Sequence, residues 1–240
     1  MKTTRIYTLF ALLMIIAVGC NKPDEPSNSG NNNDSNGGNS LNGHEYVDLG
    51  LPSGTLWATC NVGANAPEEY GDYFAWGETQ PKDTIYEWST YKYSNGIYLT
   101  KYCNDTTYGY NGFTDELTVL LPEDDAATAN WGSGWYMPNV SQCEELLTYT
   151  TNVWTTQKGV NGRLFTAANG NSLFLPAAGY RDIFFCEDGR EGVYWSSSLS
   201  VDCSSVAWRL DFSSGECEIS DRDGYYRVYG HSVRPVCSEN

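Results

Sequence analysis

Short apolar runs, separated by turn-forming residues, set the pattern of the chain from residue 44 to residue 240. Seven runs are bounded by Gly, Asn, Asp or Pro: 45–49, 55–60, 73–76, 173–175, 193–197, 207–212 and 233–237. Such runs are typical of β-strands in small antiparallel sheets. The clearest hairpin joins 207–212 to 216–220, because Gly215 can supply the turn between them.

Two segments carry helical signals. Residues 122–132 have proline and acids in the first turn, alanines in the middle and Gly132 at the end, which suits the helix dipole and a C-terminal cap. The second segment, 139–147, begins at Asn139, which can cap the helix together with Gln142. Two helices among many short strands and long loops predict an α+β fold.

The segment 79–121 is a long loop without a strand or helix pattern. It contains Trp88 and seven tyrosines. A loop of this length fits a compact domain only if it packs on itself, so we expect these rings to anchor it.

The N-terminus resembles a bacterial lipoprotein signal. Lys2 and Arg5 precede an apolar run over 9–18, and Gly19-Cys20 follows directly before polar residues. The run is too short to cross a membrane, which needs roughly 20 apolar residues. We expect a signal peptide over 1–19, acylation of Cys20 and attachment to a membrane through that lipid. An ordinary signal peptide with an incidental cysteine is the weaker alternative.

Residues 20–43 are expected to form the lipidated N-terminus and a flexible linker before a globular domain at 44–240. The linker is rich in Asn, Ser, Gly, Asp and Pro and cannot bury enough apolar surface to offset the loss of chain entropy. Lys22, Asp24 and Glu25 resemble the lipoprotein export signal of Bacteroidetes, which implies an outer-membrane protein facing the cell exterior. A polar linker also produces this pattern by chance.

Charge and cysteine content exclude several classes of function. The chain has 14 Lys and Arg against 30 Asp and Glu, so we expect no nucleic acid partner, because phosphate recognition needs a basic surface. Without Cys20, seven cysteines remain, and an odd number leaves at least one free thiol beside any disulfides. With two histidines and no zinc-type spacing we expect no metal and no cofactor. Asp124 and Asp125 could hold calcium, but a place in the first turn of a helix explains them better.

Five segments in order carry a family resemblance: 48–64 (DLGLPSGTLWATCNVGA), 69–78 (EYGDYFAWGE), 123–138, 194–198 (YWSSS) and 230–236 (GHSVRPV). Together they resemble the Fibrobacter succinogenes major paralogous domain over nearly the whole of 44–240. That family is similar to the C-terminal domain of Legionella collagen-like proteins and, more distantly, to the formylglycine-generating-enzyme group. The resemblance implies a C-type-lectin-like fold with two helices, small antiparallel sheets and long loops, in which the first and last strands lie together.

Within the family-like segments, we expect five tryptophans to be core residues: Trp57, Trp76, Trp131, Trp135 and Trp195. Arg234 is interpreted as a structural arginine. The resemblance brings the segments of Cys60 and Cys237 together, and a disulfide between these two cysteines is a hypothesis.

The sequence does not favour an enzyme. The formylglycine-generating group needs a reactive pair of cysteines, whereas the ending 232–237 holds only Cys237. No Gly-x-Ser-x-Gly, His-Glu-x-x-His or phosphate-loop motif occurs. The residue triplets used for calcium-dependent sugar binding, such as Glu-Pro-Asn, are also absent. A shared fold alone does not imply either activity, the formylglycine-generating one or calcium-dependent sugar binding.

Residues 199–229 favour a binding module. Tyr, Ser, Asp, Arg and Gly crowd there, the mixture of rigid rings and adaptable polar groups found in binding loops. We predict ligand contacts by six residues: Arg209, Asp211, Tyr225, Tyr226, Arg227 and Tyr229. The ligand would be an unknown glycan or protein. A polar hairpin surface, in a structural or fimbria-associated component that binds nothing, is the alternative.

A sharper hypothesis is that 199–229 is diversified by a retroelement that mutates adenines, since C-type-lectin-like domains are targets of such elements. Every residue there except Trp208, Glu216 and Glu218 can arise from an Asn codon, and no asparagine follows Asn171 until the last residue. However, many residue types can arise from an Asn codon in this way, and Ser, Asp and Tyr are ordinary surface residues.

Overall fold

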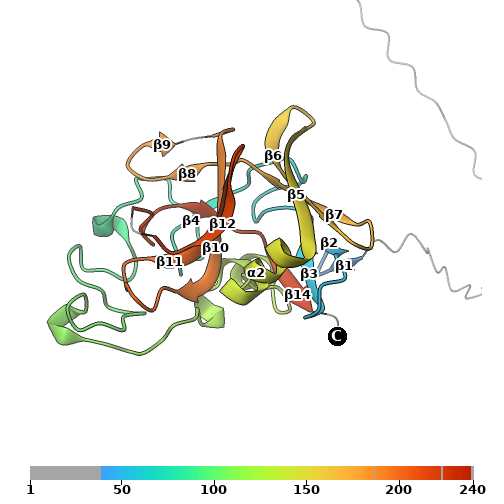
Figure 1. The fold of residues 1–240 in the computed structure, drawn as a ribbon. Helices are drawn as coiled ribbons and strands as arrows, with labels where there is room; N and C mark the ends of the chain where they lie inside the picture. The colour runs from blue at the N-terminus through green and yellow to red at the C-terminus, as the bar shows by residue number, and fades with distance from the viewer. Residues whose placement is uncertain (1–38, 187, 223, 239–240) are drawn as a thin grey trace, which may run out of the picture. The chain divides into compact units, whose positions relative to one another are not determined.

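Residues 39–186, 188–222 and 224–238 are described by a computed structural model, so the predicted signal peptide and Cys20 lie outside the described residues. The described part is a mixed α+β domain with two α-helices and several small sheets (Figure 1). This confirms the predicted α+β class. No helix in these ranges is long and apolar enough to cross a membrane.

The first sheet joins the beginning of the domain to its end. Its strands, in spatial order, are β1 (Ser40–Leu41), β2 (His44–Asp48), β3 (Thr55–Ala58) and β14 (Val236–Ser238). All neighbours are antiparallel. The first and last strands thus lie in one sheet, as expected, although β14 pairs with β3 and β1 forms the opposite edge. β1 lies inside the segment expected to be linker, because Asn42 and Gly43, both at positive φ, turn the chain back onto β2.

The predicted disulfide between Cys60 and Cys237 is wrong. Both cysteines are free thiols. The register of β3 and β14 places Cys237 opposite Leu56, four positions from Cys60. Cys60 lies beyond the end of β3 at Ala58, and its thiol contacts the Thr59 hydroxyl at 3.7 Å.

The second sheet contains the predicted hairpin. Its order is β12 (Cys217–Ser220), β11 (Ala207–Ser213), β10 (Glu191–Leu199), β13 (His231–Ser232) and β4 (Tyr73–Phe74). Only β10 and β13 run parallel. The helix α2 (Val140–Tyr149) packs against β10, β11 and β12 (Figure 1).

The third sheet was mostly missed by the sequence analysis. It consists of β5 (Thr150–Gln157), β6 (Val160–Ala167) and β7 (Ser172–Pro176), and only β7 was predicted. Lys158 and Gly159, at φ 46° and 87°, form the tight turn between β5 and β6. The remaining strands, β8 (Tyr180–Arg181) and β9 (Phe185–Cys186), form a small hairpin.

α2 begins at its predicted cap, whereas α1 begins four residues later than predicted and ends at the expected Gly132. The segment 122–132 is a 3₁₀ turn (Pro122–Asp124) followed by α1 (Ala126–Trp131), because the Asp125 side chain accepts the Thr128 N–H and starts the α-helix there. α2 has the expected capping box of Asn139 and Gln142.

Two hydrophobic clusters fill the domain. All five family-like tryptophans are buried, as predicted. Arg234 is also buried and donates to Asn61 Oδ1 and to the Ala58 and Thr59 carbonyls, which confirms its structural role. The long loop 79–121 packs through four buried tyrosines: Tyr86, Tyr91, Tyr93 and Tyr102.

Candidate functional site

The sheet β12–β11–β10 has one apolar and one polar face. Side chains alternate along a strand, and Leu210 and Phe212 of β11 belong to the core cluster that includes residues of α2. Arg209 and Asp211 therefore point to the other face. The register adds to that face the β12 residues opposite them, Ser220 and Glu218.

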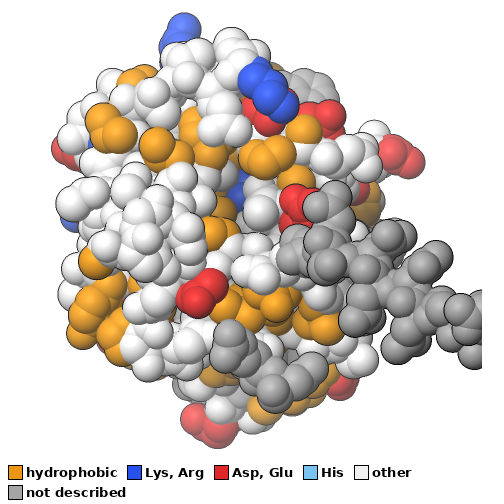
Figure 2. All heavy atoms as spheres, turned by 90° about the vertical axis from the view of Figure 1, so that its right-hand side faces the viewer, with side chains coloured by type: hydrophobic (Ala, Val, Ile, Leu, Met, Phe, Trp, Pro, Cys, Tyr) orange, Lys and Arg blue, Asp and Glu red, His pale blue; other side chains and the backbone are white. Residues whose placement is uncertain are grey.

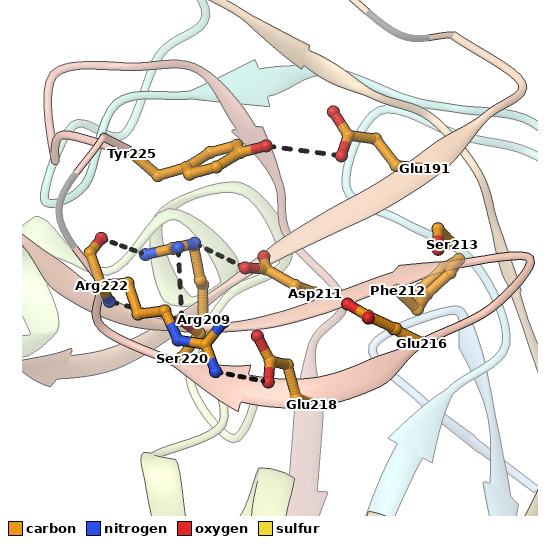
Figure 3. Close-up of a pocket in the computed structure, with 10 residues that line it drawn as sticks. All are labelled: Glu191, Arg209, Asp211, Phe212, Ser213, Glu216, Glu218, Ser220, Arg222 and Tyr225. Atoms are coloured by element: carbon orange, nitrogen blue, oxygen red, sulfur yellow. Dashed lines mark hydrogen bonds and ion pairs between the residues drawn. The ribbon is translucent and has the colours of Figure 1, made fainter.

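A hollow of about 250 Å³ lies on this polar face, and we call it the hairpin pocket (Figure 3). It is lined by Glu191, Arg209, Asp211, Phe212, Ser213, Glu216, Glu218, Ser220, Arg222 and Tyr225. Three of the six predicted ligand residues, Arg209, Asp211 and Tyr225, meet here. A pocket of this size suits a single small ligand unit, since pockets for drug-sized ligands usually begin at about 300 Å³.

Arg209 forms the buried base of the hairpin pocket, with its residue only 2% exposed. Its Nε donates to Asp211 Oδ2 at 2.9 Å, and its two terminal nitrogens donate to the Arg222 carbonyl and to Ser220 Oγ, both at 3.4 Å. The guanidinium carbon lies 4.5 Å from the centre of the Tyr225 ring. Arg209 therefore holds the pocket's polar groups in place.

Asp211 is an acid of the pocket whose pKa is strongly shifted. Burial raises its pKa to about 7, helped by Glu191 and Glu218 and opposed by the Arg209 guanidinium. Its Oδ2 accepts from Arg209, whereas its Oδ1 is buried without a hydrogen-bond partner among the described residues. Near neutral pH this oxygen can accept a hydrogen bond or, when protonated, donate one.

Tyr225 covers one side of the hairpin pocket. In Figure 3 its hydroxyl points toward Glu191, to whose Oε2 it donates at 3.4 Å. Burial and the neighbouring acids raise the pKa of Tyr225 to about 12, so the hydroxyl remains a donor. Behind it the buried His231 ring stacks on Trp195 at 3.8 Å, and burial and Arg209 lower the pKa of His231 well below its ordinary value. A neutral imidazole thus supports the tyrosine.

Tyr226 and Tyr229 lie outside the hairpin pocket. Tyr226 lines a second hollow of about 370 Å³, which we call the loop pocket. Its lining residues are Trp88, Gly96, Ile97, Leu99, Tyr108, Cys203, Ser205 and Tyr226. Tyr229 lies between the two pockets, 5.8 Å from Tyr226 and 6.1 Å from Tyr180, measured between ring centres.

The prediction that Arg227 contacts a ligand disagrees with its position. Arg227 is fully buried and donates to the carbonyls of Lys101, Tyr102 and Ser204 at 2.6–3.0 Å. Its guanidinium also lies over Trp76. Arg227 therefore ties the long loop to the C-terminal segment.

Sequence reasoning missed six polar members of the hairpin pocket: Glu191, Ser213, Glu216, Glu218, Ser220 and Arg222. The predicted hairpin contained a usable signal, because pairing 207–212 with 216–220 in antiparallel register places alternate residues of both strands on one face. No pattern in the sequence pointed to Glu191 as a site residue. It joins this face because β10 pairs with β11, and that pairing was not predicted.

The charge of the hairpin pocket disfavours anions. Four acids and two arginines line it, and both arginines are used in ion pairs, Arg209 with Asp211 and Arg222 with Glu218. A neutral or cationic ligand with hydroxyl or amine groups fits such a surface better than an acidic one. The face shown in Figure 2 likewise presents few basic side chains, with apolar groups scattered among polar atoms.

Fold and site together define an α+β domain with a polar pocket on one face of the antiparallel strands β12, β11 and β10. No family model, no curated protein and no solved structure matches the chain. In the part of the chain that the structure describes, no group of three or more His, Cys, Asp or Glu residues is arranged to hold a metal ion.

Proposed function

We propose that this chain is an outer-membrane lipoprotein, anchored through Cys20 and facing the cell exterior, whose C-type-lectin-like domain binds a glycan in the hairpin pocket. The observation that carries the proposal is that one pocket is lined both by Asp211, whose Oδ1 has no hydrogen-bond partner among the described residues, and by the partly exposed Tyr225. A sugar offers hydroxyls for the first and an apolar C–H face for the second.

The lipid anchor rests on the signal-like N-terminus and on the short linker that follows it. The C-type-lectin-like fold rests on the five family-like segments, and the pairing of β3 with β14 supports it. Globomycin treatment and metabolic labelling with a fatty acid, applied to the chain and to Cys20→Ser, test the anchor. Antibody labelling of intact cells tests the outward orientation.

Ligand binding is tested on a combined glycan and protein array with the full chain. Asp211→Asn and Tyr225→Ala should each lower the affinity about tenfold or more, because a hydrogen bond to a charged group contributes about 1.5–3 kcal/mol. Glu144→Gln, an exposed acid on α2, is the matched control and should bind normally. Binding only to protein spots, or equal binding by all variants, would contradict the glycan assignment; no binding at all favours a structural or fimbria-associated component.

We also propose that a retroelement diversifies residues 199–229, and burial limits which positions can vary. Within 199–229, Leu199, Leu210, Phe212 and Arg227 are at most 3% exposed, so diversification would be confined to surface positions. The neighbouring DNA should then contain a reverse transcriptase gene and an adenine-rich near-copy of the segment. Their absence would reject the hypothesis.

A further inference from the structure

Five aromatic rings connect the hairpin pocket to the loop pocket, and we call them the aromatic row. In spatial order they are Trp88, Tyr226, Tyr229, Tyr180 and Tyr225. Successive ring centres are 6.1, 5.8, 6.1 and 5.2 Å apart. Each ring is partly exposed, so the row reaches solvent along its length.

The two ends of the row differ in chemistry. Tyr225 ends it in the acidic hairpin pocket, beside Asp211 and Glu191. Trp88 and Tyr226 end it in the loop pocket, where Ile97 is 81% exposed and Ser205 supplies a hydroxyl. A ligand that occupies both pockets must therefore be long, with apolar faces along its middle and polar groups throughout.

We propose that the aromatic row extends the hairpin pocket into a multi-unit site for an uncharged, linear oligosaccharide. This inference rests on the proposed function, because it assigns the chain length and charge of the glycan bound there. One sugar unit lies in the hairpin pocket, and the following units contact successive rings toward the loop pocket.

The spacing and shape of the row support a chain of sugars. Successive ring planes are inclined to one another by 57°, 69°, 27° and 65°, so the row offers ring edges as well as ring faces along its length. Each tyrosine or tryptophan presents an apolar surface for the C–H face of a sugar, and dispersion contacts on such surfaces add up over several units. A small isolated ligand would need only one of the pockets.

The charges explain why the chain should be uncharged. The protein carries a formal net charge of −16, and acids outnumber arginines in the hairpin pocket. An acidic polysaccharide would meet like charges. The other four rings of the row are neutral and add contact area for the ligand without adding charge.

Isothermal titration calorimetry with defined probes tests the proposal on the full chain. The probes are disaccharides and hexasaccharides of four neutral series: cello-, xylo-, malto- and chito-oligosaccharides. In at least one series the hexasaccharide should bind at least tenfold more tightly than the disaccharide. Trp88→Ala should lower this ratio severalfold, because four rings of the row remain, whereas Trp88→Phe, which keeps a ring, should retain most of it.

Tyr149→Ala is the matched control, because Tyr149 on α2 is 54% exposed and lies outside the row; it should leave the ratio unchanged. Thermal unfolding of each variant shows whether the fold is kept, and Tyr226→Ala gives a second reading if Trp88→Ala does not fold. Equal binding of short and long chains, a ratio unaffected by both ring deletions, or no binding of any probe would overturn the proposal. If Asp211→Asn abolishes disaccharide binding while length has no effect, the extended site fails and the proposed function stands.

Discussion

At the scale of single residues, burial decides what each polar side chain of 199–229 does. Arg209 and Arg227 are both buried, yet one lines a pocket and the other binds only backbone carbonyls and rings. The sequence shows the same residue type in the same polar surroundings at both positions. Only the neighbours that the fold supplies separate a site residue from a structural one.

The raised pKa of Asp211 predicts a specific pH dependence of stability. Because its pKa in the folded protein is about 7 instead of 3.8, the folded state holds a proton that the unfolded state has released between about pH 4 and pH 7. The free energy of unfolding should therefore fall as the pH rises through this window, by about 1.4 kcal/mol per pH unit at most from this group. Asp211→Asn removes the ionisable group, so the part of this fall in the free energy of unfolding that is due to Asp211 should disappear.

Urea unfolding followed by tryptophan fluorescence from pH 4 to pH 8 measures this effect. The difference between the original chain and Asp211→Asn should change with pH below about 7 and level off above it. Glu144→Gln serves as the control and should run parallel to the original chain. Parallel curves for Asp211→Asn as well would show that Asp211 titrates at an ordinary pKa.

At the scale of elements, tight turns and caps fix where strands and helices begin and end. The β5–β6 hairpin turns through two residues at positive φ, and Gly159 is the one at 87°. Gly215, in the β11–β12 hairpin, is not at positive φ. Both glycines have open space where a Cβ would be placed, so they differ in backbone conformation and not in crowding.

Alanine substitutions at Gly159 and Gly215 test the effect of backbone conformation on stability. Gly159→Ala should lower the free energy of unfolding by about 1 kcal/mol, because a Cβ disfavours the left-handed region. Gly215→Ala should change it by much less, since its backbone suits an ordinary residue. Chemical denaturation of both variants checks this, and equal effects would rule out backbone strain as the cause.

At the scale of the whole molecule, the pairing of β3 with β14 closes the domain without a covalent link. Val236 pairs with Trp57 and also bridges to Tyr136. Hydrogen bonds and burial join the two ends of the domain, and the thiols of Cys60 and Cys237 remain free.

Cys60→Ser should therefore leave the melting temperature of the oxidised protein nearly unchanged. A native disulfide in this position would make the same substitution cost about 2–5 kcal/mol. Differential scanning calorimetry measures the stability, and alkylation with mass spectrometry of the unfolded chain shows whether Cys60 and Cys237 carry free thiols. Recovery of a Cys60–Cys237 linked peptide would overturn the structure's assignment.

The sequence by itself determined the α+β class, the Gly132 end of α1, the N-terminal cap of α2, the β11–β12 hairpin and the burial of the five tryptophans. These features depend on local patterns: turn residues, capping side chains and the strong tendency of large rings to be buried. The β5–β6 hairpin was not predicted, because its strands are rich in Thr and Asn and lack a clear apolar pattern. Its turn residues, Lys158 and Gly159, are only a weak turn signal.

Only the tertiary structure decided the site. It brought Glu191 of β10 next to Tyr225, 34 positions away, and aligned Trp88 from the long loop with Tyr226. It also moved Arg227 from the predicted surface into the interior and kept Cys60 and Cys237 apart by register. A sequence shows which chemical groups are available, but contacts between distant segments depend on strand register and loop packing, which the whole domain determines.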